Sequence, residues 1–221
     1  MSKEYIEEIK CPDCGTIGEF VVWESLNTML NPEEKPKLMS GELFEYVCPK
    51  CGSKNCVDYG MLYHQMEDNF MIEYCQNAEK VEETIETIDK ITRGGLGGLP
   101  AMSDDYKYRI VFSHNQLKEK IYIFDQGLDD RVIEVMKLFM MAHLSESNPE
   151  LKIEEMLLDI IDDKPERFAI RLEDGKWGST DFAIDMYESI RDDIISKFDD
   201  GKREYIVNLN WAIEAIQNIN E

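Results

Sequence analysis

The residues of this chain best suited to chemistry are four cysteines, which occur in two copies of one short pattern, CPxCG. The first copy spans residues 11–15 and the second spans residues 48–52. Two such C-x-x-C pairs supply four thiolates, the number that a tetrahedral structural zinc site takes. In each copy the proline presets φ for a tight turn and the glycine tolerates positive φ, so both sulfurs of a pair can point the same way. We therefore predict one structural Zn²⁺ per chain, held by Cys11, Cys14, Cys48 and Cys51.

The segment between the two copies, which we call the knuckles, has the pattern of two strands and a helix. Residues 18–26 are β-branched and aromatic and predict a strand that leaves the first knuckle. A short helix opened by Asn31 and closed near Gly41 should follow, and residues 43–47 predict a strand that returns to the second knuckle. The 33 residues between Cys14 and Cys48 exceed the roughly 15–20 of a usual zinc ribbon. Because the entropic cost of closing a loop rises only logarithmically with its length, one shared site is still expected.

Past the second knuckle, residues 60–64 and 69–75 predict two more strands, and residues 77–93 predict a helix with apolar side chains at helical spacing. Together with the earlier strands they predict an antiparallel sheet with the knuckles at one end. The segment 94–100 has four glycines and a proline and predicts a linker. It lacks the Lys-Ser/Thr of a phosphate-binding loop. We place a β-rich zinc-binding domain at residues 1–100.

Residues 105–221 predict a smaller, mixed second domain. We expect strands at 108–112, 157–161, 167–172 and 205–207, and helices at 115–126, 131–143, 186–198 and 211–219. Asp129 should cap the second of these helices and Asn210 the last. The fold class predicted for the whole chain is α+β.

Composition limits the environment and the partners. The chain has 221 residues, of which 43% are hydrophobic, and a net charge of −22 that is spread over both halves. No apolar run is long enough to cross a membrane, and the N-terminus lacks the apolar core of a signal peptide. These features and the free-thiol pattern of six cysteines predict a cytoplasmic protein. Such an acidic chain favours a protein or cationic partner, and nucleic acid is not expected as a partner because phosphate binding needs a cationic face.

The paired CPxCG knuckles, with Trp23-Glu24-Ser25-Leu26-Asn27 between them, resemble the CpXC domain of bacteria and archaea. Leu43-Phe44 before the second knuckle and Leu62-Tyr63-His64 after it are also similar. The likeness covers the first 100 to 130 residues, and residues 119–134 look like the continuation found in longer members. The resemblance implies a fold and metal binding at the four cysteines, and it implies no reaction.

Three further groups of residues could carry chemistry. Cys56 and Cys75 are expected to be buried free thiols, with a fifth metal ligand or a redox partner as the alternative. His64, with Glu67 and Asp68 close by, is expected to form hydrogen bonds within the sheet, with a metal ligand or general base as the alternative. The cluster Asp129-Asp130-Arg131 and Glu134 is expected to be a helix cap with an Arg131–Glu134 pair, with a carboxylate metal or acid/base site as the alternative.

Our leading hypothesis for the function is a non-enzymatic binding or adaptor protein with a structural zinc. Four protein thiolates fill the tetrahedron and leave no position for a hydrolytic water. Two alternatives stay open: an enzyme with a site between the two halves near His64, and thiol redox chemistry at a knuckle cysteine. The sequence does not identify the partner or the oligomeric state.

Overall fold

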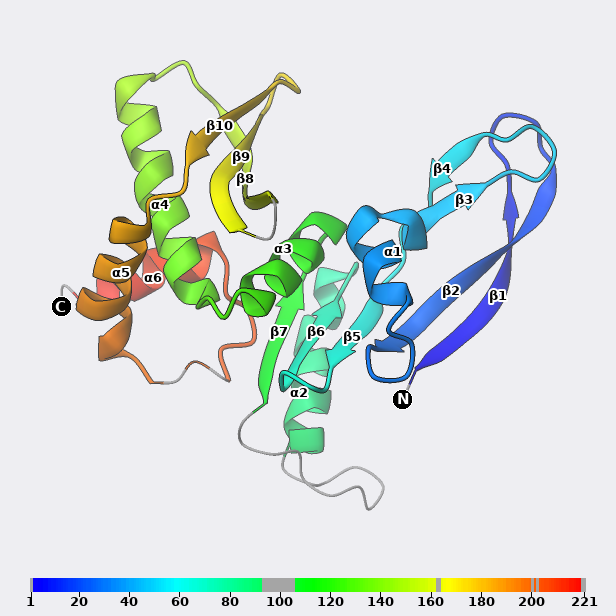
Figure 1. Cartoon of the computed structure of the whole chain (residues 1–221), viewed down its shortest axis with the longest axis horizontal. Coiled ribbons are helices and arrows are strands. Elements are labelled where there is room, and N and C mark those ends of the chain that lie inside the picture. Colours follow the sequence, from blue (N-terminus) through cyan, green and yellow to red (C-terminus); the bar gives the residue numbers. More distant parts are fainter. Residues whose placement is uncertain (1, 93–105, 162–163, 200, 202, 220–221) are drawn as a thin grey trace. The chain divides into compact units, whose positions relative to one another are not determined.

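A computed structural model describes residues 2–92, 106–161, 164–199, 201 and 203–219. The chain forms two compact units, Met1–Ser113 and His114–Glu221, each with its own sheet and helices (Figure 1). The predicted linker at residues 94–100 lies outside the described residues. The strand predicted after it belongs to the first unit, where it pairs with β6. Within the described residues, no helix is long and apolar enough to cross a membrane.

The first unit is built on a five-stranded sheet in the order β1-β2-β5-β6-β7, with a separate two-stranded ladder of β3 and β4. The strands are β1 (Lys3–Lys10), β2 (Ile17–Asn27), β3 (Glu45–Val47), β4 (Lys54–Cys56), β5 (Met61–Gln65), β6 (Phe70–Tyr74) and β7 (Lys107–Val111). The α+β class and the strands expected around residues 18–26, 60–64 and 69–75 are confirmed. The strands β1 and β4 had not been predicted, because each carries little apolar alternation of its own.

The five-stranded sheet is mixed, whereas the sequence predicted an antiparallel one. β1 and β2, and β5 and β6, pair antiparallel, but β2–β5 and β6–β7 are parallel. The connections between the paired strands explain the two parallel pairs. A helix lies between the two strands of each parallel pair, and a chain that crosses over through a helix returns in the same direction.

Four helical segments accompany this sheet: α1 (Glu34–Ser40), the 3₁₀ turns η1 (Glu42–Phe44) and η2 (Ala78–Lys80), and α2 (Val81–Thr92). The end predicted for the first helix is confirmed, since Gly41 closes α1 with φ of 87°. Residues 43 and 44, which were predicted to begin a strand, belong to η1 instead, and only residues 45–47 pair with β4.

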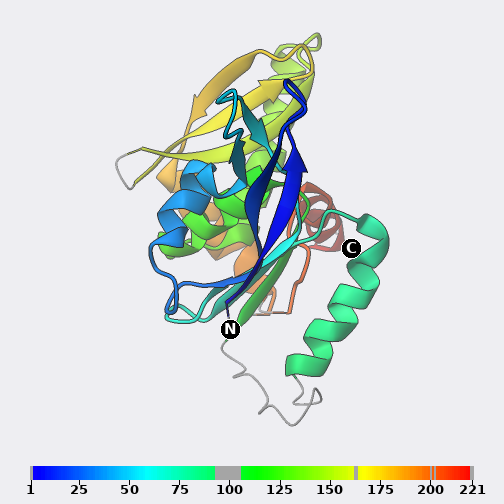
Figure 2. The same cartoon turned by 90° about the vertical axis from the view of Figure 1, so that its right-hand side faces the viewer.

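The two faces of β5 and β6 differ in burial. Along β6, Phe70, Ile72 and Tyr74 are buried, while Met71 and Glu73 are only partly buried, and β5 has the same alternation. This period of two means that one face of the sheet belongs to the core and the other is partly open. The helix α2 lies over the second face (Figures 1 and 2).

The second unit contains a three-stranded antiparallel sheet, β10-β9-β8, and four α-helices in its described residues. Its elements are α3 (His114–Asp125), α4 (Asp130–Ser147), β8 (Ile153–Ile161), β9 (Lys164–Leu172), β10 (Trp177–Asp181), α5 (Ile184–Asp193), η3 (Ile195–Lys197) and α6 (Leu209–Ile219). A core of fully buried side chains from α4, β8, β9 and α6, among them Ile133, Met136, Phe168 and Ala212, holds these elements together. Met140 and Met141 are partly buried and pack against this core.

Two predictions for the last segment of the second unit are wrong. Residues 205–207 pair with no strand in the described part of the chain, although Val207 is buried. The last helix is capped by Asn208, whose side chain accepts a hydrogen bond from the Trp211 N–H, and not by Asn210.

Candidate metal centre

The two knuckles are turns of the same geometry, and each joins the strands of a hairpin. In the first, the Cys11 N–H donates to the Thr16 carbonyl at 2.9 Å and the Gly15 N–H donates to the Cys11 carbonyl at 3.0 Å. In the second, the Cys48 N–H donates to Ser53 and the Gly52 N–H to Cys48, both at 2.9 Å. Both glycines have φ of 71°, a left-handed value that glycine adopts without strain.

These turns bring all four sulfurs together. The Sγ atoms of Cys11, Cys14, Cys48 and Cys51 all lie within 4.8 Å of one another. Across the two knuckles, Cys11 Sγ is 3.7 Å from Cys51 Sγ and Cys14 Sγ is 3.6 Å from Cys48 Sγ. Four sulfurs bound tetrahedrally to zinc at about 2.3 Å stand about 3.8 Å apart. The donor set and its spacing therefore fit a tetrahedral ion bound only by thiolates.

The cluster has a buried side and an exposed side. Cys11 and Cys48 are 1% and 2% exposed, whereas Cys51 is exposed. Backbone N–H groups, of Cys51 first and of Lys50, lower the pKa of Cys48 to about 6. The hydrogen bond with the backbone of Ser53 lowers the pKa of Cys51, but contacts with the other three cysteines and burial together outweigh it and raise this pKa to about 12.

Close packing between the two hairpins holds the knuckles in position. A Cβ atom at Gly18 of β2 would stand 2.5 Å from the Tyr46 hydroxyl and 2.9 Å from Cδ of Pro49, so only glycine fits there. The Ser53 hydroxyl donates to the Asp13 carboxylate, a contact between the two knuckles. Behind them, Phe20 makes an edge contact with Tyr46, with ring centroids 6.4 Å apart.

The two remaining cysteines lie outside the cluster. Cys75 is buried, as expected, and its thiol lies 3.1 Å from the Asn77 carbonyl. Cys56 is exposed, so the expectation of a buried thiol is wrong for this residue. It lies opposite Glu45 in the ladder of β3 and β4, which is too short to cover both of its faces.

His64 is held by hydrogen bonds within the first unit. Its Nδ1 lies 3.2 Å from Asn27 Nδ2, and its Nε2 lies 3.1 Å from the Tyr106 hydroxyl. Burial lowers the pKa of the imidazole. Glu67 accepts hydrogen bonds from the Thr28 hydroxyl at 2.9 Å. This arrangement agrees with the expected role of His64 in hydrogen bonding within the sheet.

The acidic cluster at the start of α4 forms a helix cap and part of a buried charge network. Asp129 caps the helix by accepting from the Arg131 N–H at 3.0 Å. Arg131 pairs with Asp129 at 2.7 Å and not with Glu134, so that predicted pair is wrong. Glu134 turns inward instead, toward Lys120 and Lys137, at 3.1 Å from each.

The buried network contains three acids and two lysines from α3 and α4, all nearly inaccessible to solvent: Glu119, Lys120, Asp130, Glu134 and Lys137. Lys137 contacts Glu119 at 2.8 Å, and the other oxygen of Glu119 accepts from the Leu158 N–H at 2.6 Å. Burial raises the pKa of Glu119, whereas the two lysines outweigh burial at Glu134 and lower its pKa. The sequence did not predict this network, because the two lysines have the pattern of ordinary exposed residues on a helix.

The fold and the cluster define an α+β protein in which two matched knuckles present four cysteines to one metal-sized space. The family model of the CpXC protein matches residues 9–137, more than half of the chain, so this chain belongs to the CpXC family. The match contains all four cysteines and extends to Lys137, the last member of the buried charge network. No curated protein and no solved structure matches the chain.

Proposed function

We propose that this chain is a non-enzymatic protein-binding module, stabilised by one structural Zn²⁺ on Cys11, Cys14, Cys48 and Cys51. The observation that carries the proposal is the spacing of the four sulfurs, which suits a tetrahedral thiolate site. Thiolate-only tetrahedral sites favour zinc over harder cations such as magnesium and calcium. Since the four thiolates would fill the coordination sphere, the metal contributes folding free energy and no reaction. The six cysteines form no disulfide, which suits a reducing compartment such as the cytoplasm.

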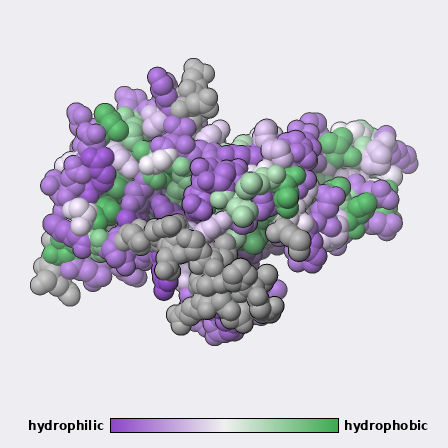
Figure 3. Space-filling model, turned by 60° about the horizontal axis from the view of Figure 1, so that its bottom comes forward, coloured by the Kyte–Doolittle hydropathy of each residue, from purple (hydrophilic) through white to green (hydrophobic). Residues whose placement is uncertain are grey.

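The hairpin of β1 and β2 supplies a surface for a partner. Ile6 of β1 and Val21 of β2 face each other across the hairpin and are 63% and 42% exposed. In Figure 3, hydrophobic side chains interrupt the hydrophilic surface over the hairpins of the first unit. Within the part of the chain that is described, β1 is the outermost strand of its sheet, with β2 as its neighbour on one side.

The charge of this strand suggests the chemistry of the partner. Glu4, Glu7 and Glu8 are all exposed on β1, next to the exposed Ile6. An extended protein segment that alternates basic and apolar residues would match both the edge of β1 and its side chains. The proposed partner is therefore a protein with such a segment.

Metal analysis of the natively purified chain tests the structural zinc. Metal content by mass spectrometry should give one zinc per chain. Thiol titration should show Cys56 reacting at once and the four cluster thiols reacting only after chelation, since Cys56 is exposed. A chain without metal would overturn the proposal. A cluster thiol that reacts while zinc stays bound would favour redox chemistry instead.

Binding of a model peptide with alternating lysine and valine tests the partner surface. Fluorescence anisotropy on the zinc-loaded chain should show binding that Ile6→Lys abolishes. Ile184→Lys is the matched control, because Ile184 is 53% exposed on α5 of the second unit. Equal binding by both variants would exclude the β1 hairpin as the binding surface.

A further inference from the structure

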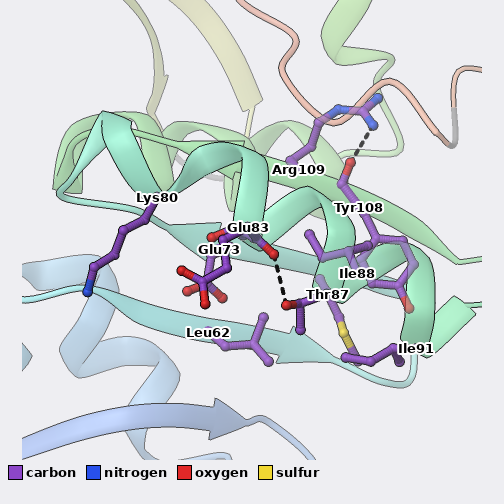
Figure 4. Close-up of a pocket in the computed structure, with 11 residues that line it drawn as sticks. Leu62, Glu73, Lys80, Glu83, Thr87, Ile88, Ile91, Tyr108 and Arg109 are labelled. Carbon is purple, nitrogen blue, oxygen red and sulfur yellow. Dashed lines mark hydrogen bonds between the residues drawn. The ribbon is translucent and has the colours of Figure 1, made fainter. Parts of the chain in front are cut away.

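The first unit contains a pocket that is separate from the cysteine cluster. It lies between α2 and the sheet, against the partly open face of β5 and β6 and the buried Tyr108 of β7 (Figure 4). Its volume is about 370 Å³. This volume falls within the range of about 300–1,000 Å³ that is usual for small-molecule sites. The pocket therefore has room for a small organic ligand.

The lining has an apolar end and a polar end. Ile88, Ile91 and Tyr108 lie toward one end in Figure 4, and Glu73 and Glu83 lie toward the other, with Leu62 beside Glu73. Of the two acids, Glu83 is exposed on α2, whereas Glu73 stands on the sheet. An occupant that satisfied both ends would carry a hydrocarbon part and a polar head.

Glu73 is the unusual group of this pocket. It interrupts the apolar strand Phe70-Met71-Ile72-Glu73-Tyr74, and it lies opposite Leu62 on the neighbouring strand. Among the described residues, no side chain or backbone group forms a hydrogen bond or ion pair with its carboxylate. A partly buried carboxylate without a partner is costly, and a cation beside it would remove that cost.

The other charged or titratable groups of the lining do not occupy the space beside the Glu73 carboxylate. Lys80 forms no ion pair with Glu73 or Glu83 in the described structure, and its side chain points away from both in Figure 4. The guanidinium of Arg109 also points away, and it donates to the Tyr108 carbonyl at 2.7 Å. The Tyr108 side chain lies toward the apolar end.

We propose that this pocket binds a small primary amine with an apolar chain, with the ammonium group on Glu73 and the hydrocarbon between α2 and the sheet. A carboxylic acid in its ionised form would meet the repulsion of Glu73 and Glu83. A neutral alcohol would fill the apolar end but would leave Glu73 without a counter-ion. The proposal depends neither on the zinc site nor on the partner surface.

The pH dependence follows from the state of Glu73. Burial raises the pKa of Glu73 to about 7. Below that pH an ammonium ion must displace a proton from the carboxyl group, so the affinity should rise about tenfold per pH unit up to pH 7 and then level off.

Calorimetric titration of the full, natively purified chain with hexylamine, hexanol and hexanoate is the test. Hexylamine should bind most tightly. Its affinity should rise up to about fourfold for each methylene added from butylamine to hexylamine. Glu73→Gln should weaken hexylamine binding about tenfold or more and remove its pH dependence, while leaving hexanol binding unchanged.

Glu82→Gln is the matched control, because Glu82 is exposed on α2 outside the lining. It removes the same charge and should leave hexylamine binding unchanged. An equal loss in both variants would show attraction to the net charge of −22 and would overturn the proposal. Equal affinity for hexanol, tighter binding of hexanoate, or no binding of hexylamine at pH 8 would also overturn it.

Discussion

Lys120 and Asp130 form an ion pair inside the second unit, with 3.1 Å between Nζ and Oδ2 and side chains that are 3% and 0% exposed. The same Nζ lies 3.1 Å from Glu134, so one lysine serves two buried carboxylates. Two ions that are removed from water recover their desolvation cost only through each other. The start of α4 therefore depends on a residue of α3.

Replacing Lys120 with methionine should destabilise the second unit by about 3–5 kcal/mol, because two buried carboxylates lose a cation. Urea denaturation followed by tryptophan fluorescence measures this loss, since Trp177 and Trp211 belong to that unit. Lys176→Met is the control, because Lys176 forms an exposed ion pair with Asp174. This variant should have the same urea midpoint as the parent. Equal midpoints for the two variants would show that the buried network contributes nothing.

Replacing Cys48 with serine should abolish stoichiometric zinc binding and cause the first unit to unfold or aggregate, because the proposed site and the fold form together. Metal analysis combined with circular dichroism checks both effects. Cys56→Ser changes an exposed thiol outside the cluster and should keep both the metal and the melting temperature. A Cys48→Ser variant that lost zinc but melted like the parent would refute the structural role.

Replacing Gly18 with alanine should destabilise the chain by about 1–3 kcal/mol, since the new methyl group would meet Tyr46 and Pro49 at less than 3 Å. Differential scanning calorimetry measures the change. Gly178→Ala in β10 is a matched control, because its Cβ would meet nothing within 4 Å. Equal melting temperatures for the two variants would contradict the close packing of the hairpins around Gly18.

The free energy of unfolding should respond to pH through Glu73. In the folded chain its pKa is raised to about 7, whereas in the unfolded chain it is about 4.3. The folded state therefore binds this proton more strongly, and the contribution of Glu73 to stability falls as the pH rises from about 4.3 to 7. Glu73→Gln should be more stable than the parent at pH 8, with a smaller gain at pH 5. Denaturation at both pH values checks this, and a constant gap would contradict it.

The cluster of four cysteines was predictable from the sequence because its determinants are local. Within five residues, two cysteines, a proline and a glycine specify a turn that points both sulfurs one way, and the same five-residue pattern occurs twice. The cap of α4 is equally local, since Asp129 bonds to an N–H group two residues away. Such features depend on backbone geometry over a few bonds.

The features that depend on contacts between residues far apart in the sequence were decided only by the tertiary structure. The strand order and the parallel pairs follow from where the crossovers return, which no single segment encodes. Glu73 is an unremarkable acid in the sequence and becomes a partly buried carboxylate only when α2 lies over the sheet. Likewise, Lys120 and Lys137 look like solvated charges until two helices bring them against three acids. The environment of a charge is set by its neighbours in space, and these come from elements far apart along the chain.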